Sequence, residues 1–198
     1  MTAARTVHIV DDDEAVRRGL QALLEVNGYA VRTFASAEAF LAAAPSAPGC
    51  ILLDLRMPGM GGLELQAELK RRGSRLPVVI ITGHGDVPAA VAALKAGASD
   101  FLEKPFDSDV VLASVAEALR AEPPPGERTA IAAAVAQLTP REREVMQLVT
   151  AGQTNKAIAH RLGIALRTVE IHRARVMEKT GARNLSELIR LALRLERP

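Results

Sequence analysis

Short apolar runs alternate with longer amphipathic segments over the first 120 positions of the chain. One such segment, 14–26, carries apolar residues at helical spacing. Strands that alternate with helices in this way form a parallel sheet with helices on both faces. Five such units within 6–120 predict an α/β fold, a flavodoxin-like doubly wound five-stranded parallel sheet. The apolar runs are 7–10, 30–34, 51–53, 78–81 and 100–102.

A proline-rich stretch at 122–127 interrupts this alternation. Three consecutive prolines cannot continue a helix and favour an extended backbone. The alanine-rich segment after them, 129–137, favours a helix. We therefore expect a first domain over 5–120, a linker over 121–133 that is proline-rich and then helical, and a second domain over 134–198.

The second domain is predicted to be all-α, with four helices. Its first helix has a strong start, with Thr139 at the N-cap, Pro140 at N1 and Glu142 at N3 as a capping box. Val145, Leu148 and Val149 form its inner stripe. Further helices are expected over 155–162, 167–180 and 185–195, and Gly163 supplies a turn between the first two of these. Two short helices joined by a glycine turn within a four-helix unit form a helix-turn-helix.

Charge divides the chain at the same place. The net charge is +2. Residues 1–120 contain 12 Lys and Arg and 15 Asp and Glu, whereas residues 121–198 contain 13 Lys and Arg and 8 Asp and Glu. An acidic half joined to a basic half indicates two tasks, and the basic half suits a polyanion such as nucleic acid.

Acidic and phosphate-binding side chains follow the predicted strands. Asp11, Asp12 and Asp13 follow the first strand, and Asp54 ends the third. Thr82 ends the fourth strand and Lys104 follows the fifth. These strand ends converge on one pocket, where several carboxylates need a hard cation such as Mg²⁺. A carboxylate, a metal, a hydroxyl and a lysine can together accept a phosphoryl group. Asp13 also suits the N-cap of the first helix.

The first domain resembles the receiver domain of two-component response regulators over about 5–120. The likeness is carried by Val10-Asp11-Asp12, by Leu53-Asp54-Leu55-Arg56-Met57-Pro58-Gly59-Met60, by Ile81-Thr82-Gly83 and by Phe101-Leu102-Glu103-Lys104-Pro105-Phe106.

This resemblance implies roles for individual residues. Asp54 is expected to be the phosphoacceptor. Mg²⁺ is expected to be bound by Asp12 and Asp54 through side chains, by Asp11 through water and by the backbone carbonyl of Arg56. Lys104 is expected to pair with the phosphoryl group, ahead of a cis Pro105. Thr82 and Phe101 match the switch pair.

Polar side chains gather on the third helix of the second domain and at its start. Thr168, Glu170, His172 and Arg173 are expected to face the major groove of DNA, while Lys156, Arg167 and Lys179 are expected to meet phosphates.

The second domain resembles the LuxR-type helix-turn-helix over about 134–198, and the whole chain resembles the FixJ branch of the FixJ/NarL-type regulators. The segments 138–145, 155–159 and 167–173 carry this likeness. One departure is Ala165, where the family often has a Ser or Thr cap.

The resemblance implies a transcription factor that is not an enzyme beyond its own phosphoryl uptake and loss. A sensor histidine kinase would phosphorylate Asp54, and the chain would then form a homodimer through a face that includes Val91 and Lys95. The dimer would bind double-stranded promoter DNA and act with RNA polymerase, as an activator.

Two other classes of function are compatible with parts of this pattern. The first is an aspartate-nucleophile phosphatase or phosphotransferase, but such enzymes usually place a second Asp where this chain has Arg56. The second is a protein-interaction or RNA-binding regulator, against which the groove-facing helix argues.

The remaining features favour a cytoplasmic protein. No apolar run approaches the roughly 18 residues of a membrane span, and the N-terminus lacks the pattern of a signal peptide. The single cysteine, Cys50, excludes an internal disulfide and is expected to be buried.

Overall fold

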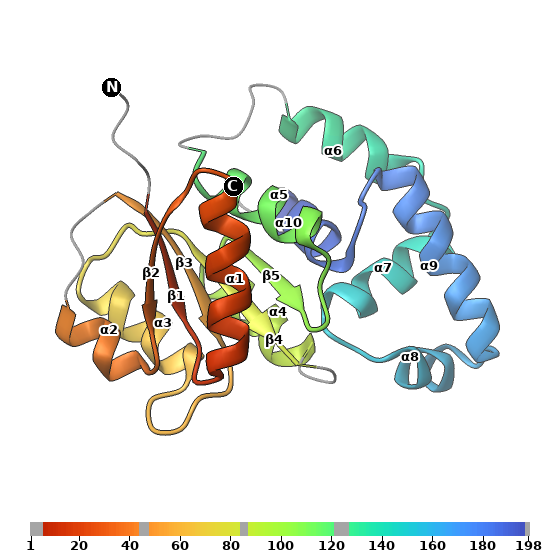
Figure 1. Ribbon diagram of the computed structural model, residues 1–198. Coiled ribbons are helices and arrows are strands. Elements are labelled where there is room, and N and C mark those ends of the chain that lie inside the picture. The colour runs from red at the N-terminus through yellow and green to blue at the C-terminus, as the bar shows by residue number, and fades with distance from the viewer. Residues whose placement is uncertain (1–5, 44–47, 84–86, 121–126, 197–198) are drawn as a thin grey trace. The chain divides into compact units, whose positions relative to one another are not determined.

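The computed structural model describes residues 6–43, 48–83, 87–120 and 127–196 (Figure 1). The chain divides into two compact units, of which the first contains the sheet and the second contains the C-terminal helices. The proline run at 123–125, where we expect the linker, lies outside the described residues.

The described residues of the first unit form one five-stranded sheet. All neighbouring strands are parallel, and their order is β2-β1-β3-β4-β5, which is the flavodoxin-like order. The predicted fold is therefore confirmed. The strands are β1 (Thr6–Val10), β2 (Ala30–Phe34), β3 (Gly49–Asp54), β4 (Val78–Thr82) and β5 (Asp100–Glu103).

Helices cover both faces of this sheet (Figure 1). Apolar side chains of α1 and α5 pack on one face in a single core cluster with β1, β3, β4 and β5. On the other face, Phe40 of α2 packs edge-on against His8 of β1. The helices are α1 (Glu14–Val26), α2 (Ala37–Ala43), α3 (Gly62–Arg71), α4 (Val87–Lys95) and α5 (Ser108–Ala118).

Double coverage explains the continuous apolar runs of the sequence. Every residue of β1 and β4 is buried, as is every residue of β3 after Gly49. A strand buried on both faces has no solvent side and therefore shows no polar alternation. The polar side chains of the candidate functional site therefore lie at the carboxyl ends of these strands. Cys50 is fully buried, as predicted, and burial raises the pKa of its thiol to about 12.

The described residues of the second unit form helices joined by short turns, with no strand among them. The capping box at its second helix is confirmed: the Thr139 hydroxyl accepts from the Glu142 N–H, and Glu142 accepts from the Thr139 N–H. Gly163 ends α8 in the left-handed region at φ 64°, as the predicted turn requires. The helices are α6 (Glu127–Ala136), α7 (Pro140–Thr150), α8 (Asn155–Leu162), α9 (Leu166–Thr180) and α10 (Leu185–Glu196).

One apolar cluster holds α7, α8 and α9 together. Val145, Val149 and Val176 are buried in it, whereas Leu148 is only partly buried at its edge. The helix α9 begins one residue earlier than predicted, and its N-cap residue Ala165 makes no side-chain hydrogen bond. Losing such a cap typically costs about 1 kcal/mol, so the start of α9 depends on its packing.

Candidate functional site

Three charged side chains meet at the carboxyl edge of the sheet. Asp11 follows β1, Asp54 ends β3 and Lys104 follows β5. The Lys104 Nζ lies 2.9 Å from Asp11 Oδ2 and 2.7 Å from Asp54 Oδ1. Asp11 is fully buried and Asp54 is 5% exposed. The parallel topology therefore brings two carboxylates, far apart in sequence but at the ends of the neighbouring strands β1 and β3, onto the one ammonium group of Lys104.

The electrostatics of this pocket leave Asp54 poorly stabilised as an anion. Burial raises the pKa of Asp54, and the charge of Asp11 raises it further, against opposing hydrogen bonds from Lys104 and the Arg56 N–H. That N–H donates to Asp54 Oδ2 at 2.6 Å. Burial opposes the charged form of Lys104, yet its hydrogen bonds to Asp54 and Asp11 raise its pKa. The ammonium group is therefore held in its charged form beside two anions.

The helix-turn-helix of the second unit presents a polar face on α9. Arg167 and Glu170 are exposed and form an ion pair at 3.2 Å, while Thr168 and His172 are partly buried. Lys156 is exposed on α8. Thus Arg167, Glu170 and Lys156 are open to a ligand.

Two family models match this chain, and they cover both units. A response regulator receiver domain matches residues 7–116, and the luxR family of bacterial regulatory proteins matches 136–192. FixJ of Azorhizobium caulinodans is 48% identical over 198 residues, 98% of this chain and 94% of that protein. FixJ of Rhizobium meliloti is 49% identical over 193 residues, 95% of each chain.

The chain belongs to the FixJ-type response regulators.

Solved structures agree with this assignment. The crystal structure of full-length FixJ from B. japonicum is similar with a TM-score of 0.58 at 46% identity, covering 98% of each chain. This FixJ-type chain is therefore a transcriptional regulator in which a receiver domain is joined to a LuxR-type DNA-binding domain. A receiver implies a sensor kinase as partner, and the LuxR-type domain implies DNA binding.

Receiver domains generally bind Mg²⁺ at the phosphorylation site, and the donor chemistry of this regulator fits that ion. Asp11 and Asp54 offer buried carboxylate oxygens, the ligand type that Mg²⁺ prefers. The raised pKa of Asp54 indicates a site that gains from added positive charge. The Asp12 side chain is exposed, and the described residues contain no group of three or more His, Cys, Asp or Glu gathered for a metal.

The other predicted pocket residues lie on or directly after β4 and β5. Thr82 is fully buried at the end of β4, and its hydroxyl donates to the Gly83 carbonyl at 3.3 Å. Phe101 is buried on β5. The Lys104–Pro105 peptide bond is cis. Asp13 is the N-cap of α1, as predicted, and accepts from two backbone N–H groups.

Sequence reasoning missed Glu38 of α2. Its Oε1 accepts from the Met60 N–H at 2.9 Å, in the loop that follows Asp54. This backbone hydrogen bond is the main reason that the pKa of Glu38 is lowered. The partners are 22 positions apart and no motif joins them, so no local signal could have found this anchor.

Two residues of α9 that were predicted to contact DNA have partners on other helices of the same domain. Lys179 Nζ lies 2.7 Å from Glu142 Oε2. Arg173 donates through Nη1 to Asn155 Oδ1. The ion pair of Lys179 holds α9 against α7, which gives this side chain a role inside the domain. The predicted dimer-face residues Val91 and Lys95 lie one turn apart on α4.

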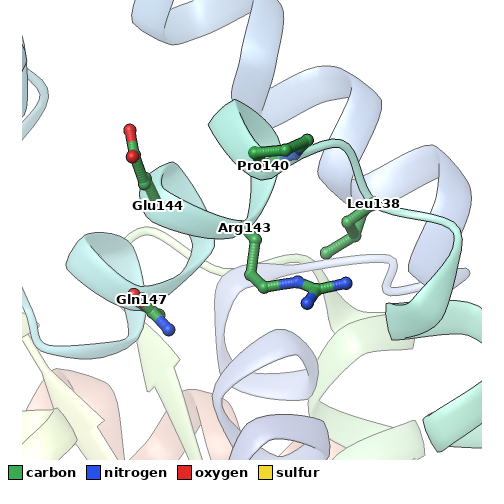
Figure 2. Close-up of a pocket in the computed structure, with 5 residues that line it drawn as sticks. All are labelled: Leu138, Pro140, Arg143, Glu144 and Gln147. Carbon is green, nitrogen blue, oxygen red and sulfur yellow. The ribbon is translucent and has the colours of Figure 1, made fainter.

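A pocket of about 260 Å³ lies on the outer side of α7 (Figure 2). Its Arg143 donates to the Val135 carbonyl at 3.4 Å, and its Glu144 pairs with Arg141. None of the predicted site residues lines it. The lining residues are Leu138, Pro140, Arg143, Glu144 and Gln147.

Glu142 is expected to make the helical domain sensitive to acid. Its pKa is lowered from 4.5 to about 2, first by the hydrogen bond from Lys179 and then by that from the Thr139 N–H. Because the folded pKa is depressed, this stabilisation is present above pH 4.5 and is lost as pH falls towards 2. The midpoint of thermal unfolding of Glu142→Gln should therefore be lower than that of the wild type at neutral pH. As the pH falls, the midpoint of this variant should decrease less than that of the wild type. Parallel midpoint curves for the two proteins would contradict this role.

Proposed function

We propose that this regulator accepts a phosphoryl group on Asp54 from a sensor histidine kinase. An Asp54 carboxylate oxygen attacks phosphorus as the bond to the donor breaks, which gives an acyl phosphate on the protein. Lys104 neutralises charge on the transferring oxygens. The observation that carries this proposal is the placement of Asp54 beside Asp11 and Lys104 at the ends of three strands.

Mg²⁺ is the proposed cofactor and would supply charge neutralisation when bound. Asp54 and Asp12 are the proposed side-chain ligands, with Asp11 through water and Arg56 through its backbone carbonyl. Thr82 and Phe101 are the proposed switch pair, and Lys104 is proposed to pair with the phosphoryl group.

We further propose that the phosphorylated chain forms a homodimer and activates transcription from promoter DNA with RNA polymerase. The proposed dimer face includes Val91 and Lys95. Two recognition helices would then meet adjacent half-sites of a two-fold DNA site.

The proposed boundaries are 5–120 for the receiver, 121–133 for the linker and 134–198 for the DNA-binding domain, and the proposed location is the cytoplasm. None of the helices in the described part of the chain has the length and apolar character of a membrane span.

The proposed DNA-reading surface is the exposed face of α9 together with the start of α8. Arg167 and Lys156 would contact phosphates, while Thr168, Glu170 and His172 would lie towards base edges. The exposure of Arg167, Glu170 and Lys156 supports this assignment.

Acetyl phosphate with Mg²⁺ tests the proposal. The wild type should gain one phosphoryl group that hydroxylamine removes, as expected of an acyl phosphate, and should then bind promoter fragments more tightly. A label that resists hydroxylamine would contradict an aspartyl phosphate.

Lys156 provides a test of the DNA surface. Replacing it by alanine should weaken binding to specific and random duplexes alike. The slope of log K against log salt should become shallower by about 0.9, because one phosphate contact is lost. Fluorescence anisotropy across a salt series measures both quantities. Lys70→Ala, at an exposed lysine of the receiver, should leave the slope unchanged, and an unchanged slope for Lys156→Ala would remove this residue from the surface.

A further inference from the structure

The apolar core contacts α8 through three of its side chains. The structure describes all eight residues of α8, and among them only Ile158 is fully buried. Ala159 and Leu162 pack against the core from partly buried positions. A short helix with one fully buried side chain can change its orientation about that side chain unless contacts fix its ends. The orientation of α8 therefore depends on contacts at its termini.

An arginine from α7 holds the C-terminal end of α8. Arg141 donates through Nη2 to the Leu162 carbonyl at 2.7 Å. This carbonyl belongs to the last turn of α8, whose carbonyl groups have no partners within the helix. A cation there also complements the negative end of the helix dipole. The other arm of the guanidinium group, Nη1, pairs with Glu144 at 2.7 Å, which limits the movement of Arg141.

An arginine from α9 holds the N-terminal end of α8. Arg173 donates through Nη1 to the side-chain oxygen of Asn155, the first residue of α8. The preceding residue, Thr154, is the N-cap and accepts from the Ala157 N–H. The Asn155 side chain is therefore available to the arginine. Both partners are partly buried, and burial lowers the pKa of Arg173. A partly buried guanidinium group bound to its own domain is poorly placed as a simple phosphate contact.

We propose that Arg173 and Arg141 are positioning residues that clamp α8 at its two ends and so set its angle to the recognition helix α9. This inference rests on the proposed DNA-binding function and replaces the groove-facing role that the sequence predicts for Arg173. Reading base edges requires α9 to sit accurately in the major groove. Loss of the clamp should therefore reduce discrimination between DNA sequences more than it reduces attraction to phosphates.

The test uses the phosphorylated full-length chain and two probes. One probe is the duplex that the wild type selects from a randomised library, and the other is a random duplex of equal length. Asn155→Ala removes the partner of Arg173 and leaves its charge in place. We expect this variant to lose about tenfold in the ratio of specific to random affinity, equivalent to about 1.4 kcal/mol. Its salt slope should equal that of the wild type.

Arg173→Met should lower the ratio of specific to random affinity by the same factor. The double variant, Asn155→Ala with Arg173→Met, should have a ratio little lower than that of either single variant, because both substitutions remove the same interaction. Arg141→Met should reduce the ratio by the same route. Arg183→Met, at an exposed arginine outside the α8–α9 pair, should keep the wild-type ratio.

A phosphate contact at Arg173 predicts a different pattern. Arg173→Met would then make the salt slope shallower by about 0.9 with no change in the ratio, and Asn155→Ala would behave as the wild type. Either result overturns the clamp. If the wild type selects no duplex at all, the proposed DNA-binding function itself fails. If it selects one and Asn155→Ala discriminates equally well, only the clamp fails.

Discussion

Replacing Asp54 by asparagine is expected to abolish phosphoryl uptake from acetyl phosphate. The amide cannot supply the carboxylate oxygen that attacks phosphorus. The other side chains of the pocket stay the same in this variant. Mass spectrometry of the intact protein after incubation with the donor and Mg²⁺ measures this directly. Asp109→Asn removes an exposed carboxylate of the same domain and should leave uptake intact. A full phosphoryl gain by Asp54→Asn would place the acceptor elsewhere.

Asp54→Asn should not fail by unfolding. The pKa of Asp54 is raised, mainly by burial, so its ionised form is disfavoured in the folded state. A group with a raised folded pKa loses stabilisation as pH rises through that pKa. The uncharged amide therefore avoids a cost that the wild type bears at neutral pH. The melting temperature of Asp54→Asn without divalent cations should equal or exceed that of the wild type.

Lys104→Met is expected to have the second large effect, on stability as well as on uptake. It would leave the buried carboxylates of Asp11 and Asp54 adjacent to each other without their ammonium partner. The free energy of unfolding of the receiver should fall by about 1–3 kcal/mol in buffer without divalent cations. Mg²⁺ should restore part of this loss, because it binds the folded state and replaces the missing charge.

Urea denaturation with and without Mg²⁺ measures the effect of Lys104→Met. Lys70→Met, at an exposed lysine of the same domain, serves as the matched control and should be close to neutral. If Lys104→Met is as stable as this control in both buffers, the ammonium group does not hold the two carboxylates together.

The sequence was sufficient for the fold because local and global signals agree. Apolar runs identify strands that are buried on both faces, and the parallel order brings Asp11, Asp54 and Lys104 to one edge without any further assumption. The capping box at Thr139 and Glu142 placed α7 correctly, since both residues act locally. The start of α9 lies within one residue of the predicted position, and Ala165 occupies the N-cap where the family often has Ser or Thr.

Side-chain partners across helices could not be predicted in the same way. Helical spacing shows which face a residue occupies, but not which distant group that face meets. Arg173 and Lys179 were therefore predicted as DNA contacts, because a positive side chain on a basic domain is normally solvated and so open to DNA. The structure gives them Asn155 and Glu142 as partners, 18 and 37 positions away. Glu38, which anchors the loop after Asp54, was missed for the same reason.

We propose that phosphorylation of Asp54 controls DNA binding by the helix-turn-helix. The most direct test of this proposal is the affinity of the wild type and of Asp54→Asn for the selected duplex, at one stated salt concentration, with and without acetyl phosphate. The donor should tighten binding by the wild type and leave binding by Asp54→Asn unchanged. Donor-dependent tightening of Asp54→Asn to the wild-type level would contradict the proposal.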